Sequence, residues 1–70
     1  MSRPAIDRLP QRQLVYEYRL AIDDAIAGRR RGRDRVRRLM EDNPRSTWST
    51  HVIYNIGKRR AEYLRDLLPF

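Results

Sequence analysis

The chain has 70 residues, of which 16 are Lys or Arg, 9 are Asp or Glu, one is His and none is Cys, and its net charge is +7. A chain of this length forms one small domain and buries only about 60% of the surface that its unfolded form exposes. The composition excludes disulfides and thiolate metal sites, and no apolar run reaches the roughly 20 residues of a membrane span, so we expect one cytoplasmic domain over residues 1–70 without membrane contact.

The first helix is predicted over residues 10–27, after a flexible arm over residues 1–9. Pro10 suits the first helical turn, where its missing N–H is not needed, and Asp7 could cap that turn from outside. Gly28 is typical of the position just past a helix end. The apolar residues that recur at helical spacing are Leu14, Tyr18, Ile22 and Ala25, with Val15 and Ile26 beside them.

A Gly-Arg-Arg-Arg-Gly connector over residues 28–32 leads to a second, short helix over residues 33–42. The residues that give this helix one apolar face are Val36, Leu39 and Met40. Asn43-Pro44 ends the helix, because the residue before a proline avoids the α region. We expect the glycines at both ends to keep the connector flexible.

A third helix is predicted over residues 44–68, with Pro44 in its first turn. An alternative is a strand over residues 47–56, where β-branched and aromatic side chains are frequent. A strand needs a partner that this chain does not supply, so we favour the helix, in which Gly57 costs about 1 kcal/mol relative to Ala. The elements together predict an all-α fold, a compact three-helix domain that contains a candidate helix-turn-helix.

The aromatic residues are divided between core and surface. Trp48 is interpreted as a core anchor, the common role of a lone Trp in a small domain. Tyr16, Tyr18 and Tyr63 are assigned to the core or its edge, and Tyr54 to the surface. The alternative is that Trp48 and the apolar chain end contact a partner or a second copy, and this contact would use Trp48, Leu67, Leu68 and Phe70.

The acidic and hydroxyl residues form no pattern typical of an active site. Asp23 and Asp24 are neighbours in sequence, as are Glu41 and Asp42, so the carboxylates of each pair do not face each other on a helix. No glycine-rich loop follows a strand, and His51 has no acid at a spacing that suggests a catalytic relay. We therefore expect no enzyme activity, no cofactor and no metal.

The positive charge is concentrated near the middle of the chain. Fifteen of the sixteen cationic residues are Arg, and the segment from Arg29 to Arg38 holds seven of them with one acid, Asp34. That segment has a net charge of +6, which leaves +1 for the other sixty residues. The planar fork of donors on Arg suits phosphates and guanine edges, so this composition indicates a nucleic-acid binder.

The flexible Arg connector is the first candidate DNA contact. Such a segment can follow phosphates or enter a narrow A·T-rich minor groove. The step Arg31-Gly32-Arg33 resembles the centre of an AT-hook, although the flanking prolines of that motif are absent. The residues predicted to contact DNA from this segment and the helix after it are Arg29, Arg30, Arg31, Arg33 and Arg37.

The second candidate is the pair of helices around the Asn43-Pro44 turn. Residues 36–40, the turn, and the Ser/Thr-rich segment after it resemble a helix-turn-helix, whose second helix enters the major groove by its N-terminal end. The resemblance implies that DNA is contacted by Arg45, Ser46, Thr47, Ser49, Thr50, Asn55, Lys58 and Arg59. Asn55 would read adenine, and Lys58 and Arg59 would hold the backbone.

The two ends of the chain resemble the C-terminal helix-turn-helix region of bacterial sigma factors. The segment Leu9-Pro10-Gln11-Arg12-Gln13 is similar to the opening of that region, and residues 59–68 are similar to its close. The Glu-Ile-Ala-x-x-Leu-Gly stretch of the family has no counterpart in the middle of this chain. The resemblance implies a DNA-binding regulator of transcription, of bacterial or phage origin.

Two other partners are consistent with the same composition. A small phage-type adaptor or inhibitor would bind an acidic surface of a host protein, such as the transcription machinery or a nuclease, and an RNA binder would use the Arg segment without reading bases. DNA binding predicts one basic face that joins residues 29–38 to Arg45 and Lys58. A protein partner predicts an exposed apolar patch with the basic residues at its rim.

Overall fold

The computed structural model describes residues 7–68, and every regular element in that part of the chain is helical. In chain order the elements are α1 (Gln11–Ile26), α2 (Arg30–Asp42), a short 3-10 turn η1 (Ser46–Trp48), α3 (Thr50–Ile56) and α4 (Lys58–Asp66). The all-α prediction is confirmed, and the strand alternative over residues 47–56 is wrong. The described residues form four α-helices where three were predicted, because the third predicted helix is divided.

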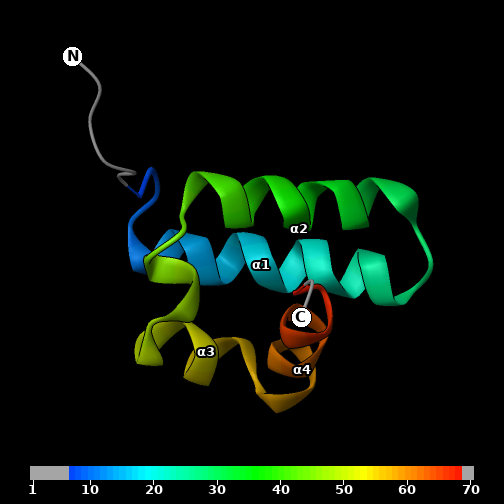
Figure 1. The fold of residues 1–70 in the computed structure, drawn as a ribbon. Helices are drawn as coiled ribbons and strands as arrows, with labels where there is room; N and C mark the ends of the chain where they lie inside the picture. Colours follow the sequence, from blue (N-terminus) through cyan, green and yellow to red (C-terminus); the bar gives the residue numbers. More distant parts are fainter. Residues whose placement is uncertain (1–6, 69–70) are drawn as a thin grey trace.

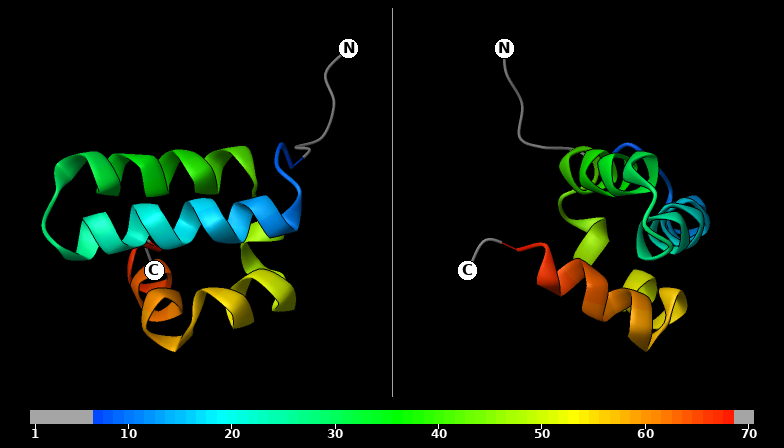
Figure 2. Two further views of the ribbon diagram at one scale, coloured as in Figure 1. Left: turned by 180° about the vertical axis from the view of Figure 1, so that it is seen from behind. Right: turned by 90° about the vertical axis from the view of Figure 1, so that its right-hand side faces the viewer.

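The helices are arranged around α1, which packs against every other helix (Figure 1). Helix α2 runs antiparallel beside α1, and α3 and α4 lie below this helix pair in Figure 1, packed against α1. Helix α4 is seen end-on in Figure 1 and lengthwise in the right-hand view of Figure 2, where α1 is seen end-on, so α4 crosses the direction of α1. The domain is therefore a hairpin of two long helices with a smaller helix pair packed against one of them.

The core lies between the helices, and all four of them contribute to it. The apolar side chains with no exposed surface are Leu14, Tyr18, Ile22, Val36, Val52, Ile56 and Leu64. Full burial of one such side chain contributes about 1.5–3 kcal/mol, so these contacts dominate the stability. The prediction that Tyr16 lies at the core edge is wrong, because Tyr16 is 61% exposed on the side of α1 that faces away from Tyr18.

The turn between α1 and α2 is shorter than the predicted connector. The N–H of Arg29 donates to the carbonyl of Asp24, and that of Gly28 donates to Ala25, which closes α1 with Gly28 at φ +91°. Helix α2 then begins at Arg30, and Gly32 lies inside it, buried against α1. A Cβ on Gly32 would lie 2.5 Å from the Cβ of Asp24, so this glycine allows a close approach of two helices and does not make the segment flexible.

The predicted helix over residues 44–68 is divided twice. Pro44 and Arg45 form a turn after α2, and η1 follows. Ser49 is extended and caps α3, because its Oγ accepts a hydrogen bond from the N–H of Val52. Gly57, at φ +96° and ψ 156°, then separates α3 from α4, a backbone conformation that is essentially restricted to glycine.

The segment from Asp7 to Leu9 is fixed to the rest of the domain, so the predicted flexible arm is wrong for these three residues; residues 1–6 lie outside the described part of the chain. Asn43 has no exposed surface, and its Oδ1 accepts hydrogen bonds from the N–H groups of Arg8 at 2.9 Å and Leu9 at 2.8 Å. Asp7 accepts from the N–H groups of Arg45 and Ser46, and therefore caps η1 where a cap of α1 was predicted.

Candidate nucleic-acid interface

The exposed surface of α2 is dominated by arginine. The helix packs against the rest of the domain through Gly32, Val36 and Leu39, which leaves the side chains between them in solvent. Arg35 forms an ion pair with Glu17 at 2.6 Å, and Arg29, just before the helix, pairs with Asp24 at 2.9 Å. The exposed arginines of α2 without an ion pair among residues 7–68 are Arg30, Arg31, Arg33, Arg37 and Arg38.

These five arginines form two rows along the helix. Arg30, Arg33 and Arg37 have the i, i+3, i+7 spacing of one helix side, and Arg31 and Arg38 share the other side, with Asp34 between the rows. Seven residues of α-helix rise about 10 Å, so one row spans a distance close to three base steps of a DNA strand. The arrangement presents several guanidinium groups at once to a line of phosphates.

Three of the four hydroxyl residues predicted to contact DNA form hydrogen bonds within the domain. The side chain of Thr47 has no exposed surface, donates to the carbonyl of Asn43 at 2.6 Å and lies 2.7 Å from the hydroxyl of Tyr18. Ser46 is buried and donates from its Oγ to the carboxylate of Asp7. Ser49 caps α3 and donates to the carbonyl of Ser46. These three hydroxyls face the protein, so they do not form the predicted DNA-contacting surface.

The hydrogen bond from Ser46 also changes the acidity of Asp7. It is the largest of the effects that lower the pKa of this carboxyl, and the N–H groups of Arg45 and Ser46 act in the same direction. The carboxylate therefore remains charged to a lower pH than an ordinary Asp. This charge holds the segment before α1 on the turn after α2.

The remaining predicted DNA contacts are exposed but scattered over three places. Arg45 follows α2, and Thr50 and Asn55 lie on α3, where the Nδ2 of Asn55 donates to the carbonyl of His51. Lys58 and Arg59 begin α4, which packs against α1 below the pair formed by α1 and α2 (Figures 1 and 2). The single basic face predicted to join residues 29–38 to Arg45 and Lys58 would therefore have to extend over several elements, and it stays a prediction.

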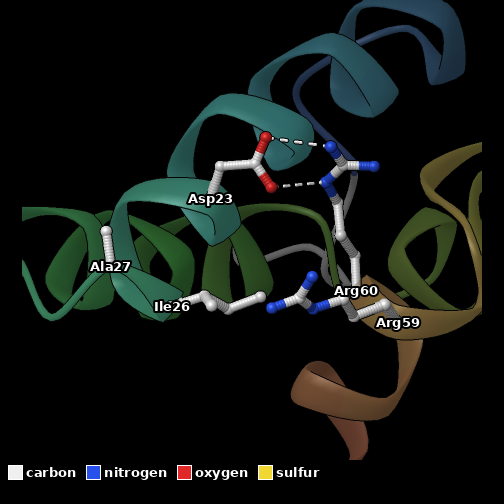
Figure 3. A pocket seen from close by; sticks show the side chains of 5 residues that line it. All are labelled: Asp23, Ile26, Ala27, Arg59 and Arg60. Atoms are coloured by element: carbon white, nitrogen blue, oxygen red, sulfur yellow. Dashed lines mark hydrogen bonds and ion pairs between the residues drawn. The ribbon is translucent and has the colours of Figure 1, made fainter.

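An ion pair fixes the start of α4 to α1. The Nε of Arg60 donates to one carboxylate oxygen of Asp23 at 2.8 Å and Nη2 donates to the other at 2.9 Å (Figure 3). The Nη1 of Arg60 also donates to the carbonyl of Ile56. The hydrogen bonds from Arg60 lower the pKa of Asp23. Arg59 extends toward Ile26 across a surface pocket of about 300 Å³ beside this pair. Arg60 is thus paired, whereas Lys58 and Arg59 in the first turn of α4 form no ion pair with any of residues 7–68.

Several apolar side chains lie on the surface. The exposed large ones are Tyr16, Leu20, Ile26, Trp48 and Tyr54. The surface assignment of Tyr54 is confirmed at 81% exposure, whereas the interpretation of Trp48 as a core anchor is wrong, because its side chain is 38% exposed. Of the predicted chain-end contacts, Leu67 and Leu68 are half-buried and Phe70 lies outside the described residues.

The described residues contain no group of three or more His, Asp or Glu side chains that could hold a metal ion. Their longest helices are also too short or too polar to cross a bilayer. No protein family, no curated protein and no solved structure matches this chain significantly.

Proposed function

We propose that the chain is a small DNA-binding regulator of transcription, of the bacterial or phage type, and that α2 is the element that contacts DNA. The observation that carries the proposal is the set of five exposed arginines on α2 without an ion pair among the described residues. Arg binds phosphate through two parallel hydrogen bonds, which makes it suited to this contact. The role in transcription rests on the resemblance of residues 9–13 and 59–68 to sigma-factor regions.

In this proposal α2 lies along the phosphates and reads no bases directly. Its arginines supply affinity and register, because contacts to phosphate carry no sequence information. The alternative binding mode, which would read the DNA sequence, is helix-turn-helix docking, in which Thr50 and Asn55 of α3 reach base edges in the major groove. Both residues are exposed. The two modes differ in their outcome, since docking by α2 alone predicts nearly equal affinity for all duplex sequences.

The proposal is tested by fluorescence anisotropy with a random-sequence DNA duplex over a salt series. We expect log K to fall linearly with log of the salt concentration, with a slope that corresponds to several released phosphate counterions. Absence of binding at low salt contradicts the proposal. A parallel series with duplex RNA separates the RNA alternative, which predicts equal or tighter binding to RNA of the same length.

A second candidate function is favoured by the exposed side of α1. Tyr16 is 61% and Leu20 is 52% exposed, and together with Arg19, Asp23 and Arg60 they line a surface pocket of about 310 Å³. Exposed apolar side chains with arginines beside them are typical of a surface that binds another protein, and the arginines favour a partner whose contact is rimmed by acidic residues. Because Asp23 is already paired with Arg60, the free charge beside the pocket is that of Arg19, and the complementary partner is an acidic host-protein surface.

This second function is tested by a photo-crosslinking side chain at position 20 in the cells that produce the protein. We expect one acidic protein to be crosslinked there and not from Gln13, an exposed residue of the same helix. The purified partner should then bind the chain, and Leu20→Glu should abolish that binding. Equal crosslinking from positions 13 and 20 contradicts this function.

A further inference from the structure

A pocket of about 490 Å³ lies between the start of α2 and the end of α4. Its lining comes from α1, the α1–α2 turn, α2 and α4, and consists of Ala25, Gly28, Arg29, Arg30, Arg33, Tyr63 and Leu67. Three of these residues are arginines and none is an acid. Segments far apart in sequence therefore build a hollow that is positively charged on one side and apolar on the other.

The two sides of the pocket suit two parts of one ligand. Arg29 is held by Asp24, which leaves the guanidinium groups of Arg30 and Arg33 for an anion. Tyr63 lies on α4 and Leu67 directly follows that helix, four residues later, and both are half-buried. Arg matches the geometry of a phosphate, and an aromatic ring offers a stacking surface to a base. The volume lies within the range of pockets that bind small organic ligands.

We propose that this pocket binds one unpaired nucleotide, with its phosphate on Arg30 and Arg33 and its base against Tyr63 and Leu67. The inference rests on the proposed DNA binding, because Arg30 and Arg33 also begin the row of arginines that would follow the duplex phosphates. An unpaired nucleotide at the end of a bound duplex would reach the pocket from that row. The same chemistry is offered by a free nucleotide, so the experiment separates these two sources.

The test compares a blunt DNA duplex with the same duplex carrying a short unpaired extension at one end. We expect the wild-type protein to bind the extended duplex at least about fivefold more tightly, the ratio expected when one base stacks on an aromatic side chain. Tyr63→Leu keeps an apolar side chain and should remove this preference without changing blunt-duplex affinity or its salt dependence. The matched control is Tyr54→Leu, on the exposed surface of α3, which should keep the preference.

A second readout does not depend on the stability of a variant. A 2-aminopurine base in the extension loses fluorescence when it stacks, so binding should quench it in the extension and leave a duplex-internal 2-aminopurine unchanged. Equal affinity of the wild-type protein for the two DNAs, or an unquenched extension, overturns the inference while blunt-duplex binding still supports the proposed function. Loss of all duplex binding contradicts the proposed function itself.

The free nucleotide is tested with dAMP and with inorganic phosphate at equal ionic strength. If the pocket takes DNA ends, dAMP should compete only weakly with the extended duplex and phosphate should not compete. If dAMP saturates the site and removes the fivefold preference, the ligand of the pocket is a free nucleotide, which still supports a nucleotide site. Equal competition by phosphate and dAMP shows that the base makes no contact, and this overturns the inference.

Discussion

The hydroxyl of Tyr18 in α1 lies 2.7 Å from the hydroxyl of Thr47 in η1, and neither side chain has any exposed surface. Thr47 donates onward to the carbonyl of Asn43, so the proton shared with Tyr18 comes from the tyrosine. Asn43 in turn binds the N–H groups of Arg8 and Leu9. This chain of hydrogen bonds joins three segments of the domain at one buried point.

Thr47→Val should therefore destabilise the fold and leave DNA binding unchanged. The substitution removes the acceptor for the buried hydroxyl of Tyr18, and an unsatisfied buried polar group costs about 1–3 kcal/mol. Denaturant unfolding followed by circular dichroism measures this loss. The double variant with Tyr18→Phe should recover part of it, because no hydroxyl is then left unpaired. A changed slope of log K against log salt for Thr47→Val would instead return Thr47 to the DNA contact.

The protein should lose stability in alkaline solution because of Tyr18. Burial raises the pKa of this phenol to about 12 from its ordinary value of 10.0. Below pH 10 the phenol is protonated in both the folded and the unfolded chain, so its contribution is constant. Between pH 10 and about 12 only the unfolded chain releases the proton, and the free energy of unfolding falls by roughly 2–3 kcal/mol. Tyr18→Phe should remove this fall, whereas Tyr16→Phe, at an exposed position, should retain it.

Gly57→Ala should destabilise the protein by about 1–3 kcal/mol, because its φ of +96° and ψ of 156° belong to a region that only glycine adopts without strain. A continuous helix through this position would predict the opposite, a gain of about 1 kcal/mol. The sign of the change in thermal or denaturant unfolding decides between the two. The matched control is D-alanine at position 57 of a chemically synthesised chain, which accepts the positive φ and should retain the stability.

Gly32→Ala should also destabilise, since the new Cβ would lie 2.5 Å from the Cβ of Asp24 and 2.6 Å from the backbone nitrogen of Ala25. Backbone cannot move aside as a flexible side chain can, so we expect a loss of about 1–3 kcal/mol or more. Asp34→Ala on the exposed face of the same helix should change the stability by less than about 0.5 kcal/mol. A stabilising Gly32→Ala would show that α2 does not pack closely on α1.

Local patterns predicted the parts of the fold that depend on one helix alone. The spacing of Leu14, Tyr18 and Ile22 defines the buried side of α1, and the Asn43-Pro44 step marks the end of α2. The roles of Gly32 and Gly57 could not be read in the same way. A glycine in sequence is compatible with flexibility, a helix break or close packing, and only the neighbouring helix at Gly32 and the backbone angles at Gly57 distinguish these.

The candidate site was likewise predictable where it depends on one segment alone, and not where it depends on contacts between distant segments. Exposure of the arginines follows from their charge, so a cationic surface over residues 29–38 was expected, although Arg30 and Arg31 were assigned to a flexible connector and lie on α2. The hydroxyls of Ser46 and Thr47 could not be placed, because a Ser/Thr-rich helix start has the same composition whether it faces solvent or core. Their partners, Asp7 and Tyr18, lie 39 and 29 positions away in the chain. The pocket beside Tyr63 likewise depends on how α1, α2 and α4 are arranged, because all three contribute residues to its lining.

The most direct measurement is the salt dependence of duplex binding by two variants of equal net charge. One replaces Arg30, Arg33 and Arg37 with Ala, and the other replaces Arg12, Arg19 and Arg65, which are exposed on α1 and α4. If the five free arginines of α2 each neutralise a phosphate, the wild-type slope of log K against log salt is about −4 to −5, and it falls to about −2 in the first variant and stays unchanged in the second. Equal slopes for the two variants would contradict a DNA contact by α2.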